Sequence, residues 1–528
     1  MNQAASGAGN AVDYFLDRHV RDGAGGVLAF ADPWRGLHYA ELATASRQFA
    51  SALCRSGIGQ ERRIAVLLPD TVDFPIVFWG ALRAGVVPVP INPLLPSEGI
   101  GYILADTRAE AVVISAPLME KLFSTLHSLP DLRQIIVAEP DGTPVAGVAD
   151  SRAIGFQEFL DRGDPAFDAV TVSADEVAFW LYSSGSTGAP KGVRHVHGSL
   201  RATADTYGSE VLRIRPDDVV FSAAKLFFAY GLGNAMTFPM SVGACAVLLP
   251  DRPTPDAVLA TMRRFQPSLF CGVPTVFAGL LAHADIGPGA GSARLRRCIS
   301  AGEALPAEIG RRWGGIVGVE ILDGIGSTEM LHIFLSNQPG DIRHGTTGRA
   351  VPGYELRIVG ENGDDVENGI SGELLVRGGS AAEGYWNQRD KSRKIFRGEW
   401  THTGDTYIRD VDGYYHYCGR SDDMLKVGGI WVAPFEVEEA LMSHPAVLEA
   451  AVVGQADAAG LTKPRAFIVL QASMRHHDPE TMKNLLKTHV KERVGAWKYP
   501  RWIEIVDALP KTATGKIQRF KLREAATP

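Results

Sequence analysis

A glycine- and hydroxyl-rich segment gives the strongest chemical signal in the sequence. An apolar run ends at Tyr182 and is followed by SSGSTGAPKG, residues 183–192. Glycine lets backbone amides approach phosphate oxygens, hydroxyl groups donate hydrogen bonds to the same oxygens, and Lys191 adds positive charge. The Walker pattern of P-loop NTPases has Gly before the Lys and Ser or Thr after it, but here Pro190 and Gly192 hold those places. The segment therefore predicts a phosphate-binding loop of another kind, with a solvated Ser/Gly linker as the alternative.

Five further polar segments follow along the chain. They are SAGEALP (300–306), DGIGSTE (323–329), WTHTGD (400–405), YCGRSDD (417–423) and PKTATGK (510–516). Taken alone, Glu329 could start a helix, Asp405 could make a turn, and Lys516 could belong to a solvated basic run. The set in this order resembles the adenylate-forming superfamily of acyl- and aryl-CoA ligases, peptide-synthetase adenylation domains and beetle luciferases. The resemblance extends over essentially the whole chain and is strongest to ligases of the benzoate-CoA and 4-hydroxybenzoate-CoA type.

The resemblance implies a fold class and a division into domains. It implies an α/β protein with a large N-terminal AMP-binding domain, residues 1–421, made of two α/β-layered subdomains and a β-rich subdomain at about 340–420. A small mobile α+β C-terminal domain, residues 422–528, would carry the catalytic lysine. Asp422 matches the hinge position at which such domains rotate between half-reactions.

The chemistry implied by the resemblance is activation of a carboxylate with ATP. A carboxylate is a poor acyl electrophile, but its attack on the α-phosphorus gives an acyl-adenylate from which a thiol can displace AMP. The first step gathers negative charge, so it needs cations and amides placed beforehand. Lys516, Thr328 and Glu329 match the catalytic positions, and Glu329 would also be a ligand of Mg²⁺. The ATP/AMP-binding positions match Ser183, Ser184, Gly185, Ser186, Thr187, Gly188, Lys191, Gly302, Glu303, Ala304, Asp323, Gly324, Thr328, Asp405 and Arg420.

The resemblance puts one wall of the acyl pocket in KLFFAYGLG, residues 225–233. Amino-acid-activating relatives carry an aspartate there for the substrate ammonium, whereas this chain has Phe-Phe-Ala-Tyr. A flat slot of aromatic, small and β-branched side chains would suit a planar ring. His332 could accept a proton from a ring substituent or could be a core histidine. The acyl-substrate positions match Phe228, Ala229, Tyr230, Gly231, Ala301, Gly326, His332 and Ile333.

The acceptor of the acyl group is indicated by two adjacent glycines after the hinge. Gly428 and Gly429 match a Gly-Gly element of aryl-CoA ligases, and glycine allows close approach of the backbone to a narrow pantetheine chain. The chain contains no appended carrier-protein domain. Both features favour free CoA over a carrier-protein thiol.

The elements that must position these residues alternate between strand and helix patterns. Short β-branched runs at 63–69, 110–116 and 133–139 predict strands, and the patterns at 74–85 and 118–129 predict helices between them. This alternation indicates parallel sheets covered on both faces. After about residue 340, turns rich in Gly, Asp and Asn separate short alternating runs and predict hairpins. Alternation of helix and strand resumes after Arg420.

Composition places the chain among ordinary globular proteins and excludes several classes. Its 528 residues are 45% hydrophobic and 21% charged, which is unlike disordered or coiled-coil chains. The net charge of −7 gives no reason to expect a nucleic acid or an anionic membrane as partner. Five cysteines without a close pair exclude a disulfide framework and the common zinc patterns. The first residues lack a secretory-signal pattern and no apolar run spans a bilayer, so we expect a cytoplasmic monomer or homodimer.

The leading hypothesis is an ATP-dependent aryl-CoA ligase for benzoate or a substituted benzoate, with ATP and CoA as co-substrates. A medium-chain fatty acyl-CoA ligase would need a deeper, non-planar pocket. A stand-alone adenylation enzyme would load a carrier protein instead of CoA. A catalytically silent nucleotide sensor would have no reason to keep Lys516, Glu329 and Asp405.

Replacing Lys516 by Ala should nearly abolish adenylation while leaving thioester formation from a supplied aryl-adenylate largely intact. The reason is that its charge is needed only while the carboxylate and the α-phosphate are both anionic. Measuring the two half-reactions separately tests this assignment, and equal losses in both would refute it.

Overall fold

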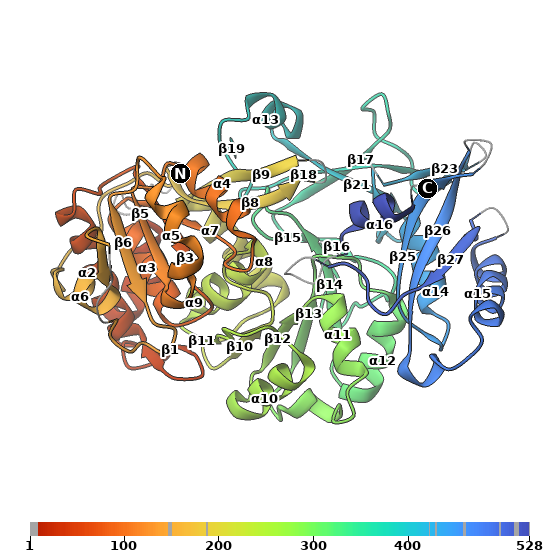
Figure 1. Cartoon of the computed structure of the whole chain (residues 1–528), viewed down its shortest axis with the longest axis horizontal. Coiled ribbons are helices and arrows are strands. Elements are labelled where there is room, and N and C mark those ends of the chain that lie inside the picture. Colours follow the sequence, from red (N-terminus) through yellow and green to blue (C-terminus); the bar gives the residue numbers. More distant parts are fainter. Residues whose placement is uncertain are drawn as a thin grey trace.

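The computed structural model describes residues 9–145, 150–185, 188–421, 423–427, 430–457, 461–495, 498–511 and 517–526. Two largely parallel sheets with helices between and around them make up most of the structure (Figure 1). The smaller of the two is all-parallel and has the order β4-β3-β5-β6-β7. Its strands are β3 (Arg63–Leu67), β4 (Val87–Pro90), β5 (Ala111–Ser115), β6 (Gln134–Ala138) and β7 (Ala153–Gly155).

The larger sheet has nine strands in the order β16-β15-β14-β13-β12-β10-β11-β1-β2. Strands β14 to β1 of this order are parallel, and β15, β16 and β2 are antiparallel additions at its edges. The strands are β1 (Leu28–Ala31), β2 (Gly36–His38), β10 (Val219–Ser222), β11 (Cys245–Val247), β12 (Leu269–Gly272), β13 (Arg297–Ser300), β14 (Ile321–Gly326), β15 (Ile333–Ser336) and β16 (Arg349–Ala350).

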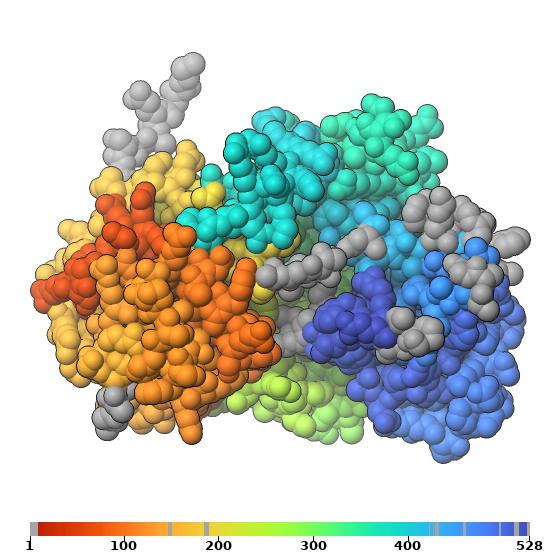
Figure 2. All heavy atoms as spheres, turned by 45° about the horizontal axis from the view of Figure 1, so that its top comes forward, coloured from red at the N-terminus to blue at the C-terminus, as the bar shows by residue number. Residues whose placement is uncertain are grey.

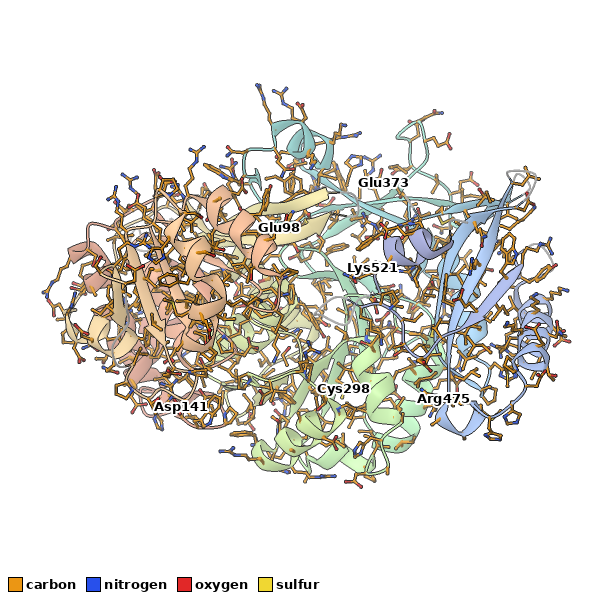
Figure 3. All side chains as sticks on the ribbon, in the orientation of Figure 1. Glu98, Asp141, Cys298, Glu373, Arg475 and Lys521 are labelled. Atoms are coloured by element: carbon orange, nitrogen blue, oxygen red, sulfur yellow. The ribbon has the colours of Figure 1, made fainter. Side chains whose placement is uncertain are left out.

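Alternate residues of these strands face opposite layers, as the pleat requires. Ile64 of β3 and Val220 of β10 belong to one shared core, in which α3 (Asp73–Arg83) has all its residues buried. Their neighbours Ala65 and Phe221 pack into two separate outer cores, one under α4 and α5 and the other under α10, α11 and α12. Two sheets therefore sandwich a middle helical layer, with Cys298 visible on the larger sheet in Figure 3.

Helices connect the parallel strands, and their caps follow the sequence. For example, α10 begins with Pro255 after Thr254, whose side chain accepts the N–H of Ala257, and ends at Phe265, which is followed by Gln266 in the left-handed region. The helices of the N-terminal four-fifths are η1 (Asp13–Asp17), α1 (Arg18–Arg21), α2 (Tyr39–Arg55), α3 (Asp73–Arg83), α4 (Ser97–Thr107), η2 (Ala116–Leu118), α5 (Met119–His127), α6 (Phe156–Asp161), α7 (His197–Thr203), η3 (Ala204–Val211), α8 (Ala229–Leu232), η4 (Gly233–Thr237), α9 (Phe238–Val242), α10 (Pro255–Phe265), α11 (Pro274–Leu281), η5 (Pro288–Gly291), α12 (Ala307–Val317) and α13 (Arg389–Ile395).

Two smaller antiparallel sheets complete the larger body. A three-stranded sheet has the order β19-β9-β8, with β8 (Val177–Gly185), β9 (Gly188–Val196) and β19 (Gly384–Tyr385). A five-stranded sheet consists of β17 (Glu355–Val359), β18 (Ser371–Arg377), β20 (Phe396–Arg397), β21 (Trp400–Arg409) and β22 (Tyr415–Arg420). The latter matches the hairpins expected after residue 340.

The C-terminal residues form an α+β unit with its own core, packed against one end of the larger body (Figure 2). Its main sheet has the order β25-β26-β27, with α14 and α15 packed into the same core. The elements are β23 (Leu425–Val427), β24 (Ile430–Val432), α14 (Pro434–Met442), β25 (Val447–Ala456), β26 (Thr462–Leu470), η6 (Ala472–Met474), α15 (Pro479–Val494), β27 (Trp502–Ile505) and α16 (Arg519–Ala526).

The predicted fold class is confirmed: the protein is α/β, with a large N-terminal part and a small C-terminal part. The strands expected at 63–69, 110–116 and 133–139 are β3, β5 and β6, and the helices expected at 74–85 and 118–129 are α3 and α5. Among the described residues, no helix is long and apolar enough to cross a membrane.

Candidate active site

Four neighbouring parallel strands of the large sheet end at one edge. Ser222 of β10 pairs with Cys271 of β12, Gly272 of β12 pairs with Ser300 of β13, and Ser300 pairs with Asp323 of β14. The segments that leave β10 and β13, and the last residues of β14, therefore start at the same level. In open α/β sheets ligands bind beyond the carboxyl ends of the strands. This edge brings together the predicted acyl wall, the segment 301–306 and the pair Thr328–Glu329.

The acyl wall is held rigidly at this edge. Phe228 is extended, and α8 begins at Ala229. The hydroxyl of Tyr230 donates to the carbonyls of Gly272 and Ile299, each at 3.1 Å, so its ring is fixed against the ends of β12 and β13. A Cβ on Gly231 would clash with the carbonyl oxygen of Lys225, which explains a glycine at that position.

His332 lies behind this wall. The sequence allowed two interpretations of it, a core histidine or a proton acceptor for a ring substituent. It is 2% exposed and packs against Phe238, with ring centroids 4.5 Å apart. Its Nε2 is 3.3 Å from the carbonyl oxygen of Tyr230, which can only accept, so Nε2 carries the proton. Its Nδ1 has no partner among the described residues, and burial lowers the pKa of His332 to about 3. The ring is therefore a neutral core histidine that retains one unused acceptor.

Gly326 and Ile333 face each other at the join of β14 and β15. A Cβ on Gly326 would clash with the carbonyl of His332, so only glycine allows this close pairing. Ala301 follows β13 and is buried. The structure thus brings the predicted acyl-substrate residues to the ends of β10, β13 and β14.

The glycine-rich segment differs from the expected strand followed by a loop. The strand continues past Tyr182 to Gly185, and the segment is the end of an antiparallel hairpin in which Ser183 pairs with Lys191 and Gly185 with Gly188. Ser184 lies within β8. The apolar run predicted the strand correctly up to Tyr182. Its continuation to Gly185 was not predicted, because glycine is a poor strand former.

Lys191 lies on β9 beside the other charged residues of the candidate site. Its Nζ is 4.8 Å from the ring centroid of Tyr385. Burial lowers the pKa of Lys191, while the charge of Glu329 opposes that shift and the charge of Arg420 adds to it. The hairpin therefore presents a partly desolvated cation close to an acidic and a basic side chain.

Glu329 lies in a turn between β14 and β15 and not at the start of a helix. The hydroxyl of Tyr385 donates to its Oε1 at 2.8 Å, and its backbone carbonyl accepts the N–H of Ala382 at 2.8 Å. The carbonyl of Thr328 accepts a hydrogen bond from Nε2 of the buried His195 at 2.8 Å. Both residues are thus fixed from β9 and from the segment around β19.

Asp405 and Arg420 are paired residues of β21 and β22. Nη1 of Arg420 lies 3.3 Å from Oδ1 of Asp405 and 2.9 Å from the carbonyl oxygen of Thr403. The side chain of Asp405 is 11% exposed and that of Arg420 is 43% exposed. The carboxylate is therefore oriented by a guanidinium that itself reaches solvent.

The segment after β13 meets the C-terminal part of the chain. Oε1 of Glu303 accepts the N–H of Ile517 at 2.9 Å, and Oε1 of Glu439 accepts the N–H of Ala307 at 3.4 Å. Gly302 has a φ of +93°, and Ala304 follows Glu303 in the same loop. Ile517, which follows Lys516 in the sequence, is thereby held at the predicted adenine wall.

Asp323 lies at the end of the run that pairs β14 with β13, followed by Gly324. It is 7% exposed, and burial raises its pKa well above the ordinary range. Its Oδ1 has no hydrogen-bond partner within the described part of the chain. An oxygen of this kind can bind a polar group that enters from the sheet edge.

The donors at Glu329 fit Mg²⁺. Mg²⁺ is usually held by one or two carboxylates together with substrate phosphates and water, and not by a cage of protein ligands. Glu329 is half-buried, and its Oε1 accepts a hydrogen bond from the hydroxyl of Tyr385. No cluster of three or more His, Cys, Asp or Glu suited to a metal exists among the described residues.

Six predicted residues lie outside the described residues: Ser186, Thr187, Asp422, Gly428, Gly429 and Lys516. Conversely, sequence reasoning missed Tyr385 and His195, which hold Glu329 and Thr328. Neither belongs to a recognisable motif, because each acts through a partner more than 50 residues away. The only local signal was the strand pattern that contains His195.

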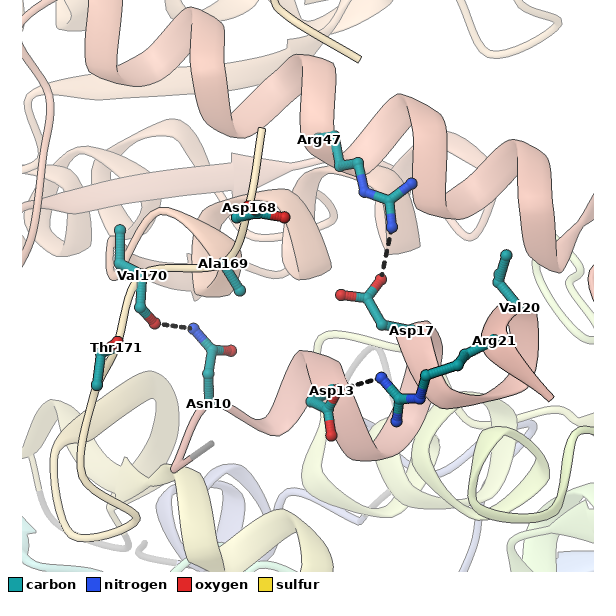
Figure 4. A pocket seen from close by; sticks show the side chains of 10 residues that line it. All are labelled: Asn10, Asp13, Asp17, Val20, Arg21, Arg47, Asp168, Ala169, Val170 and Thr171. Carbon is teal, nitrogen blue, oxygen red and sulfur yellow. Dashed lines mark hydrogen bonds and ion pairs between the residues drawn. The ribbon is translucent and has the colours of Figure 1, made fainter. Parts of the chain in front are cut away.

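A hollow of about 430 Å³ lies elsewhere, near the N-terminal helices (Figure 4). Four of its charged side chains are paired with one another, Arg21 with Asp13 at 2.9 Å and Arg47 with Asp17 at 3.5 Å. None of the predicted site residues lines it. The edge of the large sheet therefore remains the candidate active site.

Comparison with known proteins agrees with this geometry. Residues 16–386 match the AMP-binding enzyme family, and residues 436–516 match the AMP-binding enzyme C-terminal domain. The chain belongs to the AMP-binding enzyme family. The predicted membership of the adenylate-forming superfamily is thereby confirmed.

Individual relatives are similar over nearly their whole length. The chain is 52% identical to a 4-hydroxybenzoate–CoA/benzoate–CoA ligase of Rhodopseudomonas palustris, over 98% of this chain and 94% of that protein. It is 50% identical to a benzoate–CoA ligase of Thauera aromatica, over 98% and 96% of the two chains. A crystal structure of a benzoate CoA ligase from Burkholderia xenovorans is 48% identical, with a TM-score of 0.89 over 97% of this chain and 99% of that one.

Replacing Tyr385 by Phe should raise the Mg²⁺ concentration needed for half-maximal diphosphate release. The phenol fixes the carboxylate of Glu329, and one net hydrogen bond is worth about 0.5–1.5 kcal/mol, so we expect roughly a three- to tenfold increase. Tyr39→Phe is the matched control, because it removes a buried hydroxyl that donates to the carbonyl of Ala244 instead. An unchanged Mg²⁺ requirement in Tyr385→Phe would contradict the role of Glu329 as a metal ligand.

Proposed function

We propose that the protein is an ATP-dependent aryl-CoA ligase. It converts benzoate or a substituted benzoate, ATP and CoA into the aryl-CoA, AMP and diphosphate through an aryl-adenylate. The observation that carries this proposal is the meeting of an uncharged wall, Phe228 to Gly231, with the polar residues Thr328 and Glu329 at one sheet edge. The similarity to benzoate–CoA ligases over the whole chain supports the same substrate class.

The acyl wall favours a planar acid without an ammonium group. Tyr230 offers its ring but not its hydroxyl, which is already donated to two carbonyls. Ala229 and Gly231 are small and leave room for a ring beside Tyr230. The pocket therefore binds a ring by contact and offers the acceptor nitrogen of His332 to a ring hydroxyl or amino group.

Adenylation requires the negative charges of a carboxylate and of ATP to come together. Lys191, with Ser183 to Gly188, binds phosphate oxygens, and Asp405 accepts the ribose hydroxyls beside Arg420. Glu303, Ala304 and Gly302 form the wall for the adenine, with Asp323 and Gly324 beneath it. Lys516 neutralises the carboxylate and the α-phosphate together, and Thr328 donates to the phosphate. Mg²⁺ held by Glu329 supplies charge neutralisation at the phosphates.

The thiol step needs a second arrangement of the C-terminal part. We place the domain boundary at Asp422, so that residues 422–528 rotate as a unit and exchange Lys516 for the Gly428–Gly429 element. That element lines the channel for the pantetheine of CoA. Rotation between half-reactions is a common solution where one site must serve two steps.

One assay tests the proposed function against its rivals. Diphosphate release is measured with a panel of benzoates and medium-chain fatty acids, with and without CoA, and the thioester is quantified separately. We expect release with benzoates and CoA-dependent formation of aryl-CoA. Release without thioester formation would favour a carrier-protein loading enzyme, preference for fatty acids would favour a fatty acyl-CoA ligase, and no release would favour a nucleotide sensor.

Replacing Ala229 by Leu should raise the KM for benzoate by roughly 10- to 100-fold and leave the KM for ATP within twofold. A misfit of this size in a closed slot costs about 1–3 kcal/mol, and the nucleotide lies elsewhere. The melting temperature of the variant controls for overpacking, because Ala229 is buried. A parallel rise in both KM values would remove Ala229 from the acyl slot.

The preference between a hydroxybenzoate and benzoate should not change with pH between about 5.5 and 8. Burial lowers the pKa of His332 to about 3, so the ring gains a proton only far below this window and Nδ1 stays an acceptor throughout. The ratio of the two kcat/KM values, measured across the window, tests this expectation. A step in the ratio near pH 6.5 would show that His332 titrates as a solvated histidine.

A further inference from the structure

One residue of α4 binds two segments of the nucleotide side of the candidate site. Oδ2 of Asp106 accepts a hydrogen bond from the hydroxyl of Tyr182 at 2.6 Å. The backbone carbonyl of the same Asp106 accepts a hydrogen bond from Nε1 of Trp386 at 2.9 Å. The two partners are 76 and 280 residues away in sequence. Asp106 belongs to none of the sequence motifs.

Tyr182 controls where the glycine-rich hairpin begins. It directly precedes Ser183 in β8 and pairs with Gly192 of β9. Because the sheet order is β19-β9-β8, no strand among the described residues is paired with the outer edge of β8. Two-stranded hairpins are marginal in water, so side chains must fix an outer strand. The phenol of Tyr182 provides such a fixed point one residue before the phosphate-binding segment.

Trp386 connects the same anchor to Glu329. Its backbone N–H donates to the carbonyl of Gly192 at 2.8 Å, and it follows β19, whose Tyr385 donates to Glu329. Its ring packs against that of Trp180 with centroids 4.7 Å apart. The guanidinium carbon of Arg63 lies 6.0 and 5.8 Å from the two ring centroids. Trp180 of β8, Trp386 and Arg63 thus form one packed cluster. In this cluster Trp386 directly follows Tyr385, the residue that orients Glu329.

We propose that Asp106 is a positioning residue for the nucleotide half of the reaction, acting through Tyr182 on the phosphate-binding hairpin and, with Trp386, on the support of Glu329. The inference rests on the proposed function. It assigns Asp106 no contact with substrate. Loss of the contact between Asp106 and Tyr182 should therefore weaken the binding of ATP. It should not affect the acyl wall, which follows β10.

The test compares Asp106→Ala, Asp106→Asn, Tyr182→Phe and the double variant Asp106→Ala/Tyr182→Phe in the full chain. For each, KM values for ATP and benzoate are measured in diphosphate release, and binding of ATP with Mg²⁺ is measured by calorimetry. Tyr102→Phe is the matched control, since it changes an exposed tyrosine on the same helix. Melting temperatures are recorded for all variants.

We expect Asp106→Ala and Tyr182→Phe each to raise the KM and Kd for ATP by roughly five- to twentyfold, with the KM for benzoate within twofold. Asp106→Asn should retain near-normal ATP binding, because its amide oxygen still accepts the phenolic proton. The double variant should be no worse than the more affected single one, because both remove the same bond.

Several results would overturn the proposal. These are equal increases in both KM values, additive losses in the double variant, or a lowered melting temperature with unchanged ATP binding. If the unaltered enzyme releases no diphosphate with any aromatic acid, that result would count against the proposed function instead. The calorimetric titration with ATP would still decide the role of Asp106 in that case.

Discussion

The shared register of β10, β12, β13 and β14 is the constraint on which the rest of the site depends. Paired residues place the ends of these strands at one level, so that segments far apart in sequence emerge side by side. A slip of one residue would turn every side chain of a strand to the opposite face. It would move Phe221 and Phe270 out of the outer core and Val220 and Leu269 out of the central one. Correct burial of the core and correct assembly of the site are therefore the same condition.

Charged side chains of the candidate site are oriented by contacts within the protein. Burial lowers the pKa of Lys191, and the nearby carboxylate of Glu329 opposes that effect. Tyr385 orients this carboxylate, and Arg420 orients the carboxylate of Asp405. Fixed donors and charges of this kind need little rearrangement when a polyanion arrives, which is the condition for electrostatic stabilisation of a charged transition state.

The sequence was sufficient to predict those features whose signal lies within one short segment of the chain. Strands β3, β5 and β6 could be predicted because each is a short β-branched run, and the order of motifs predicted the family. The continuation of β8 to Gly185 could not, because glycines signal a turn and a hairpin partner provides the ordering. The contacts of Tyr385 with Glu329 and of Asp106 with Trp386 join residues 56 and 280 positions apart. Only the folded topology brings such pairs together, and an isolated tyrosine or tryptophan reads as an ordinary core residue.

The C-terminal part has its own core and its own buried ion pair. Arg519 forms a bidentate pair with the buried carboxylate of Glu438, at 2.8 and 2.9 Å, and the core around β25 and β26 is separate from the others. The C-terminal part is joined to the sheet edge by the backbone N–H of Ile517, which donates to Glu303, and by Glu439 of α14, which accepts the backbone N–H of Ala307. Such bonds are each worth about 1 kcal/mol net and exchange readily with water. The proposed rotation of residues 422–528 would break these hydrogen bonds and leave the core around β25 and β26 intact, and two half-reactions at one carbonyl carbon require such a second position.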